Sequence, residues 1–197
     1  MTDNTRTVVK ISGPADILGV LPYRLGFHPA ESVVVVCLHG PRRRDGLVMR
    51  LDLMPEDADD DAADDLATRA AHVGATGAVV VCYTEAGPDP VADRPGPDGY
   101  GRAVPRRHLI EALVRRLAQE GITVIESLLV QGGRWWSYDC YDESCCPATG
   151  TELPQALTPA AAHYAAASVA QGASVLADRD QLARSIRPPR NPVADES

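Results

Sequence analysis

The chain has 197 residues, a formal net charge of −8 and 45% hydrophobic residues, which suits one globular domain that folds without a metal or a disulfide. Binding to duplex nucleic acid requires clustered Lys and Arg that neutralise phosphates, so a chain this acidic predicts no nucleic-acid partner. Its apolar runs fall short of the ~20 residues of a membrane span, and its first residues lack a signal-peptide core. We therefore expect a cytoplasmic protein without membrane contact.

In chain order, the apolar pattern first predicts an edge strand at residues 8–11 and a helix that begins at Pro14 and stops at Pro22. Residues 22–32 follow as an irregular connection. The β-branched run at 33–38 and the alternating run at 47–53 predict an antiparallel hairpin. An acidic helix at 55–73 then leads to a buried strand at 78–83, and this crossover predicts a parallel strand pair.

The remaining part of the chain continues the alternation of helices and strands. Residues 84–104 hold four Pro and four Gly and predict a long loop, either a mobile surface segment or a lid. An amphipathic helix at 105–120 precedes strands at 122–130 and 134–139, which form a hairpin through a glycine-rich turn. Two further helices, at 159–171 and 178–186, are predicted, the first with Thr158 as its N-cap.

This order of elements predicts an α/β protein with a mixed, mostly parallel sheet, antiparallel hairpins and helices on both faces. We expect a single domain over residues 1–187 and a disordered tail over residues 188–197. Cys37 and Cys82 lie inside apolar strands and are predicted to be core residues.

The stretch RWWSYDCYDESCCPATG, residues 134–150, contains both tryptophans and three of the five cysteines. Alternate side chains of a strand share a face, so Arg134, Trp136 and Tyr138 are predicted to lie opposite Trp135 and Asp139, with one tryptophan in the core. The aromatics either cover the sheet or form a binding surface. All five residues are candidate binding residues.

Cys140, Cys145 and Cys146 allow three interpretations. They are structural or disulfide-forming thiols, or they bind zinc as thiolates, although a fourth ligand is missing nearby, or one of them is a catalytic thiol. The neighbouring acids Asp139, Asp142 and Glu143 are expected to raise the thiol pKa values and to lower reactivity.

A second polar cluster lies in the loop PYRLGFHP, residues 22–29, and its candidate binding residues are Tyr23, Arg24, Phe27 and His28. Arg24 and Arg134 offer planar guanidinium groups that suit a carboxylate or a phosphate. The alternative is a packing plug in which Phe27 anchors the loop.

These two segments resemble the actinobacterial domain-of-unknown-function family 4192. The matching positions are Pro22, Leu25, Gly26, Phe27, Pro29, Ser32 and residues 134–147, and the resemblance spans roughly residues 17–171. The family carries no established activity. The resemblance implies only that the two clusters belong together, on one side of the sheet.

We therefore expect a binding module for a small molecule or a protein partner that uses both clusters. The first alternative is an enzyme for a small anionic substrate, in which Cys140, Asp139 or His28 does the chemistry. The second is a thiolate zinc protein. The sequence leaves the cofactor and the oligomeric state open.

Overall fold

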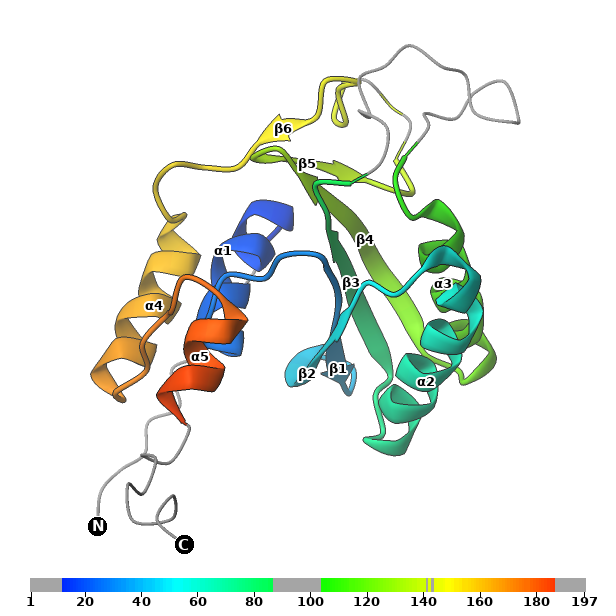
Figure 1. The fold of residues 1–197 in the computed structure, drawn as a ribbon, viewed down its shortest axis with the longest axis horizontal. Coiled ribbons are helices and arrows are strands. Elements are labelled where there is room, and N and C mark those ends of the chain that lie inside the picture. Colours follow the sequence, from blue (N-terminus) through cyan, green and yellow to red (C-terminus); the bar gives the residue numbers. More distant parts are fainter. Residues whose placement is uncertain (1–11, 87–103, 141, 143, 187–197) are drawn as a thin grey trace, which may run out of the picture. The chain divides into compact units, whose positions relative to one another are not determined.

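The structure is a computed structural model that describes residues 12–86, 104–140, 142 and 144–186. Its contacts divide the chain into two compact units (Figure 1). We call the unit with residues 16–29 and the described residues from 157 onward the helical unit, and the unit with 13–15 and the described residues of 30–156 the sheet unit. Each unit is described by itself below.

The sheet unit contains the sheet with two long helices. Its elements are β1 (Ser32–His39), β2 (Arg44–Asp52), a 3-10 turn (Glu56–Ala58), α2 (Asp59–His72), β3 (Gly77–Tyr83), α3 (Arg107–Gln119), β4 (Thr123–Gln131), β5 (Arg134–Ser137) and β6 (Thr151–Glu152). The predicted strands and helices of this region are therefore present, and β6 is additional. Helices with a mixed sheet confirm the predicted α/β class.

The strand order is β2-β1-β3-β4-β5-β6. β3 and β4 pair in parallel, whereas the other four neighbouring pairs are antiparallel, so the prediction of a mostly parallel sheet is wrong. β2 and β3 run in the same direction, as the crossover predicted, but the predicted pairing of these two strands is wrong, because β1 lies between them and is antiparallel to both. A buried valine run suits a central strand of either direction, and only long-range pairing distinguishes the two.

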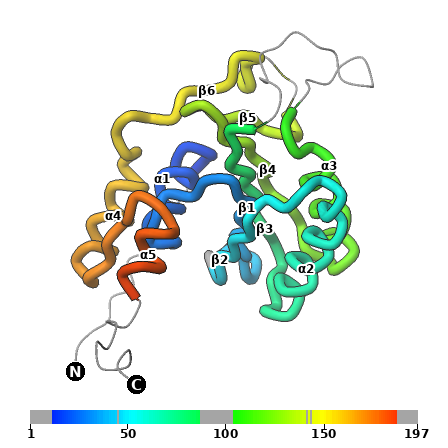
Figure 2. The backbone as a smooth tube through the Cα atoms, in the orientation of Figure 1, coloured from blue at the N-terminus to red at the C-terminus, as the bar shows by residue number. Residues whose placement is uncertain are grey.

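α2 and α3 lie side by side and run in the same direction along one face of the sheet (Figure 2). That face and the helices share one apolar core, with Val80 and Cys82 from β3, Leu66 from α2 and Leu113 from α3. Cys37 and Cys82 are both fully buried, which confirms their predicted place in the core. The prediction that helices cover both faces of the sheet stays a prediction.

The turn between β4 and β5 contains two glycines, and its backbone conformation requires them. Gly132 and Gly133 both have positive φ, 56° and 72°. A two-residue hairpin turn of this type requires positive φ at both central positions, where glycine has no Cβ to clash. The predicted hairpin is confirmed, with Leu129 opposite Trp136 and Gln131 opposite Arg134.

The helical unit contains α1 (Pro14–Leu25) from residue 16 onward, α4 (Pro159–Ala170) and α5 (Arg179–Ser185). α1 continues through Pro22, so the predicted stop at that residue is wrong. An internal proline costs about 3 kcal/mol, but Leu18, Leu21 and Pro22 itself are buried, and that burial offsets the lost hydrogen bond. The helix ends at Leu25, and Gly26 follows it with a φ of 80°.

The rest of the helical unit follows local signals. Thr158 Oγ1 accepts a hydrogen bond from the Ala161 amide at 3.2 Å, which confirms Thr158 as the N-cap of α4. The same hydroxyl donates to the Asp16 carboxylate of α1 at 2.5 Å. After Gly26, Phe27 forms a β-bridge with Leu176.

Three predictions fall on residues outside the described ranges: the strand at 8–11, most of the loop at 84–104 and the tail at 188–197. The single domain over 1–187 also stays a prediction. Among the described residues, no helix combines the length and the apolar character needed to cross a bilayer.

Candidate functional site: a loop that presents three thiols

The aromatic residues of β5 divide between the two faces of the sheet, as the alternation predicts. Trp136 is 5% exposed and Tyr138 is 3% exposed, and both belong to the core beneath α2 and α3. Trp135 points the other way and is half-buried. One tryptophan therefore enters the core, as expected.

Two side chains of β5 hold the chain where it returns to the sheet. The Trp136 indole Nε1 donates to the Ala148 carbonyl at 3.1 Å. The Arg134 guanidinium donates to the carbonyls of Thr149 and Gly150 at 2.7 and 3.0 Å, and also to the Glu152 carboxylate at 3.0 Å. These contacts, with the β5–β6 pairing, fasten the C-terminal end of the cysteine loop, which we define as residues 138–150.

The other end of the cysteine loop is fastened beside β4. The Tyr138 amide donates to the Ser127 carbonyl at 2.9 Å, and its buried hydroxyl donates to the Pro105 carbonyl at 2.7 Å. The Asp139 carboxylate accepts a short hydrogen bond from the Ser127 hydroxyl. Both ends of the loop are therefore attached to rigid structure, and the residues between them are partly or largely exposed where the structure describes them.

Asp142 organises the tip of the cysteine loop. Its carboxylate accepts hydrogen bonds from the Ser144 amide and hydroxyl at 2.9 and 2.7 Å. Its carbonyl accepts the amides of Cys145 and Cys146 at 3.1 and 2.7 Å. This tight turn brings the two adjacent cysteines back towards Cys140.

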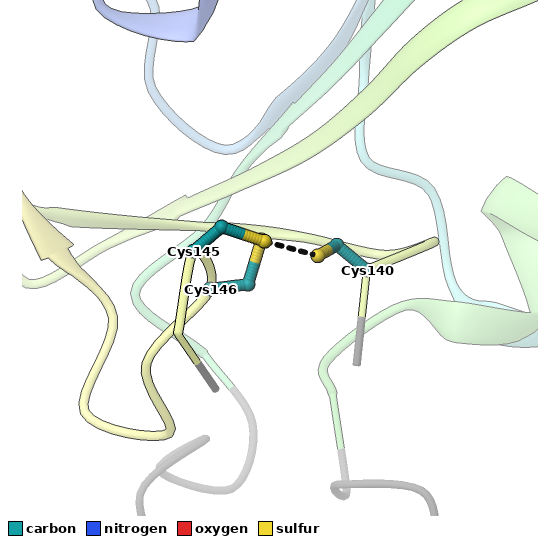
Figure 3. Close-up of side chains that lie close together, drawn as sticks. All are labelled: Cys140, Cys145 and Cys146. Atoms are coloured by element: carbon teal, nitrogen blue, oxygen red, sulfur yellow. Dashed lines mark hydrogen bonds between the residues drawn. The ribbon is translucent and has the colours of Figure 1, made fainter. Parts of the chain in front are cut away.

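The three thiols point towards one another at the tip (Figure 3). The Sγ atoms of Cys140 and Cys145 lie 3.2 Å apart, those of Cys145 and Cys146 lie 3.8 Å apart, and all three lie within 4.8 Å of one another. Cys145 is exposed and the other two are half-buried. None of the three thiols is fully buried, which does not favour the interpretation as structural thiols, and the disulfide, zinc and catalytic interpretations stay predictions.

The three thiols of the loop have pKa values that are shifted in different directions. Bonds from Cys146 and Cys145, and then from the Asp142 backbone, lower the pKa of Cys140 below its usual value, although the Asp142 charge opposes this. The Cys140 partner raises the pKa of Cys145, and burial raises the pKa of Cys146 to about 12. The expectation that acidic neighbours raise every thiol pKa is wrong for Cys140, because hydrogen bonding to the thiolate outweighs the charge repulsion.

Arg134, one of the two arginines of the predicted anion site, uses its guanidinium to hold the cysteine loop. The donors of Arg134 reach loop carbonyls and Glu152, so this side chain acts as a structural clasp. Tyr23 and Arg24 lie on α1, Phe27 is 6% exposed and His28 is exposed, all in the helical unit. The buried Phe27 agrees with the packing-plug interpretation. A surface shared by the two clusters joins residues of different units and stays a prediction.

An open pocket of about 530 Å³ lies between α3 and the start of the cysteine loop. Its lining residues are Arg107, Ile110, Glu111, Val114, Arg115, Tyr138 and Asp139. Arg107 forms an ion pair with Glu111 at 3.3 Å, and its guanidinium lies 6.0 Å from the Tyr138 ring centre. Charges of both signs line this pocket, which therefore lacks the positive bias of an anion site.

The sequence did not reveal the structural roles of three residues that build the loop, namely Ser127, Asp142 and Gly150. The pattern Asp142–Ser144 was a usable signal, because an Asp followed two residues later by Ser favours a tight turn stabilised by its own side chain. The contacts of Ser127 and Gly150 join distant parts of the sequence and left no such signal.

The fold and the site together define an α/β protein with a mixed sheet and a surface loop that carries three converging thiols. The family model described as "Domain of unknown function (DUF4192)" matches residues 14–197, so the chain belongs to this family, as the resemblance implied. Neither the curated proteins nor the solved structures contain a match. An actinobacterial origin and a cytoplasmic location stay predictions.

Proposed function

We propose that the chain binds a thiophilic metal ion through Cys140, Cys145 and Cys146. The observation that carries this proposal is the convergence of their three Sγ atoms to within 4.8 Å on a loop fastened at both ends. A zinc ion with sulfur at ~2.3 Å in tetrahedral geometry places its ligands about 3.8 Å apart, close to the spacing of the thiols. Small movements of the side chains would therefore suffice to place one ion between them.

The donor chemistry also supports a metal. Thiolates select soft or borderline ions such as Zn²⁺ and Cu⁺ over Mg²⁺ or Ca²⁺. Three protein ligands with a fourth position left to water or a substrate are typical of catalytic rather than structural zinc sites. The lowered pKa of Cys140 favours its thiolate, whereas the raised pKa values of Cys145 and Cys146 mean that a bound ion would have to displace their protons.

The metal proposal predicts a stoichiometry that depends on the loop cysteines. The reduced full-length protein is expected to bind one Zn²⁺ per chain, measured by elemental analysis after dialysis, because three thiolates together hold the ion. Serine at any one of the three loop cysteines is expected to weaken zinc binding at least tenfold in competition with a chromogenic chelator. Cys37→Ala is the matched control, since it removes a buried thiol of β1 away from the cysteine loop and should keep the zinc. Zinc that stays bound when all three loop cysteines are serine would refute the site.

The same site predicts a pH dependence with a definite sign. The pKa values of Cys145 and Cys146 are raised, so both thiols hold their protons at neutral pH in the free protein. Zinc must displace at least these two protons, and its apparent affinity should therefore rise at least about a hundredfold per pH unit between pH 6 and 8. Chelator competition across this range measures the slope. An affinity that is independent of pH would show that the ligands are not these thiols.

A further inference from the structure

Cys140 and Cys145 form a close pair of thiols within the cluster. Their sulfur atoms lie 3.2 Å apart, whereas those of Cys145 and Cys146 lie 3.8 Å apart. The second distance equals the spacing of about 3.8 Å that tetrahedral zinc requires. The first is shorter, and a disulfide needs about 2 Å. The side chains of Cys140 and Cys145 meet across the open end of the turn (Figure 3).

We propose that a hydroperoxide converts Cys140 and Cys145 to a disulfide, and that this bond and the bound metal exclude each other. The cysteine loop would then hold its ion only while reduced and release it on oxidation. The release half of the inference rests on the proposed metal function, whereas the disulfide half rests on the thiol geometry alone.

The chemistry balances with hydrogen peroxide as the oxidant. One thiol sulfur attacks a peroxide oxygen, the O–O bond breaks, and a sulfenic acid and one water form. The second thiol displaces the hydroxyl group of the sulfenic acid as a second water, and the S–S bond forms. Two electrons pass from the two sulfurs to the peroxide, and two thiols with one peroxide become one disulfide with two waters.

The loop is already arranged for this bond. Asp142 holds the Cys145 amide through its carbonyl at 3.1 Å, and Tyr138 and Trp136 fix the two ends of the loop. The reacting sulfurs therefore need to approach by about 1 Å, which side-chain rotation supplies. Cys146 is the immediate neighbour of Cys145, and a bond between adjacent residues would strain the backbone.

Oxidation also removes the ability to hold the ion. A sulfur in a disulfide is no longer a thiolate, so two of the three ligands are lost and Cys146 alone remains. Cys37 and Cys82 are fully buried and are expected to stay reduced. Among the five cysteines of the chain, oxidation is therefore expected to be confined to those of the cysteine loop.

The test uses reduced full-length protein, with and without one equivalent of Zn²⁺, treated with a small excess of hydrogen peroxide. The count of free thiols, measured after denaturation, should fall from five to three. Peptide mapping should find Cys140 linked to Cys145. A chromogenic chelator should report release of the zinc in step with the loss of thiols. Cys146→Ser should still form the disulfide, and Cys37→Ala should behave as wild type with four starting thiols.

Several outcomes would overturn the inference. A link between chains, a link to Cys146 in the wild-type protein, or oxidation to sulfinic acid without a disulfide would refute the pairing. Zinc that stays bound to the disulfide form would refute the exclusion. Failure of the metal proposal is distinguishable: the reduced protein would then bind no zinc, yet Cys140 and Cys145 would still link, so the disulfide half would stand and the release half would be overturned.

Discussion

Replacing Asp59 by alanine is expected to lower the free energy of unfolding by about 3–5 kcal/mol, because it leaves a buried arginine without its counter-charge. Asp59 opens α2 and is 1% exposed, and its carboxylate accepts a hydrogen bond from Arg106. Arg106 lies just before α3 with a φ of 58°, and its guanidinium also donates to the Met54 carbonyl at 2.9 Å. The pair therefore joins the starts of the two helices that cover the sheet.

Chemical denaturation of a small set of variants would separate this effect from the general cost of losing an acid. Asp65→Ala is the matched control on the same helix, since its partner Arg69 is 64% exposed. An exposed pair of this kind contributes only about 0.3–0.5 kcal/mol. The double variant Asp59→Ala with Arg106→Met should recover much of the loss, because it removes both charges. Equal effects of Asp59→Ala and Asp65→Ala would contradict this account.

The ion pair also has a pH signature. Burial raises the pKa of Asp59, and this outweighs the attraction of Arg106, which alone would lower it. The folded state therefore holds the Asp59 proton to a higher pH than the unfolded state does. The sign follows: ionisation of Asp59 lowers the stability as the pH rises from its unfolded pKa near 3.9 to the raised folded pKa, and the contribution is constant outside this window.

Alanine at Gly150 is expected to cost about 2–5 kcal/mol of stability and to weaken metal binding by the cysteine loop. A Cβ at this position would lie 2.3 Å from a ring carbon of Trp136, and the φ of 70° disfavours any residue with a side chain. The left-handed backbone contributes about 1–2 kcal/mol and the overpacking about 1–3 kcal/mol. The Trp136 ring cannot easily move, because it is buried and its Nε1 donates a hydrogen bond to the Ala148 carbonyl.

Gly133→Ala is the matched control for Gly150→Ala. Gly133 has nearly the same φ, 72°, but a Cβ there would meet nothing within 4 Å. It should cost only the backbone part, about 1–2 kcal/mol. Urea denaturation and zinc competition on both variants would test the argument. If the two variants lost the same stability, the Trp136 contact would have no role in holding the loop.

Patterns within short stretches of sequence predicted the elements that depend on interactions between residues close in the chain. The valine runs of β1 and β3, the amphipathic α3, the Thr158 cap and the paired glycines at 132 and 133 each correspond to an element found in the structure. The alternation along this strand also predicted that only one of the two tryptophans enters the core, and the structure shows that it is Trp136.

Helix α1 and the thiol pKa values show where local rules failed. Pro22 remains inside α1 because the helix buries Leu18 and Leu21, and this tertiary gain is absent from a propensity argument. The pKa of Cys140 falls because two other thiols bond to it, and no charge count along the sequence contains that information. Both effects depend on which atoms meet in space.

The amino-acid sequence by itself determined the family, the α/β class and most of the helices and strands, since these depend on periodicity and on rare residues that local sequence displays. Only the tertiary structure decided that β1 lies between β2 and β3, and that Cys140 meets Cys145 and Cys146. Strand order and thiol contacts are set by long-range pairing and by the contacts that clasp the cysteine loop, and the energies of those contacts are shared by residues far apart in the chain.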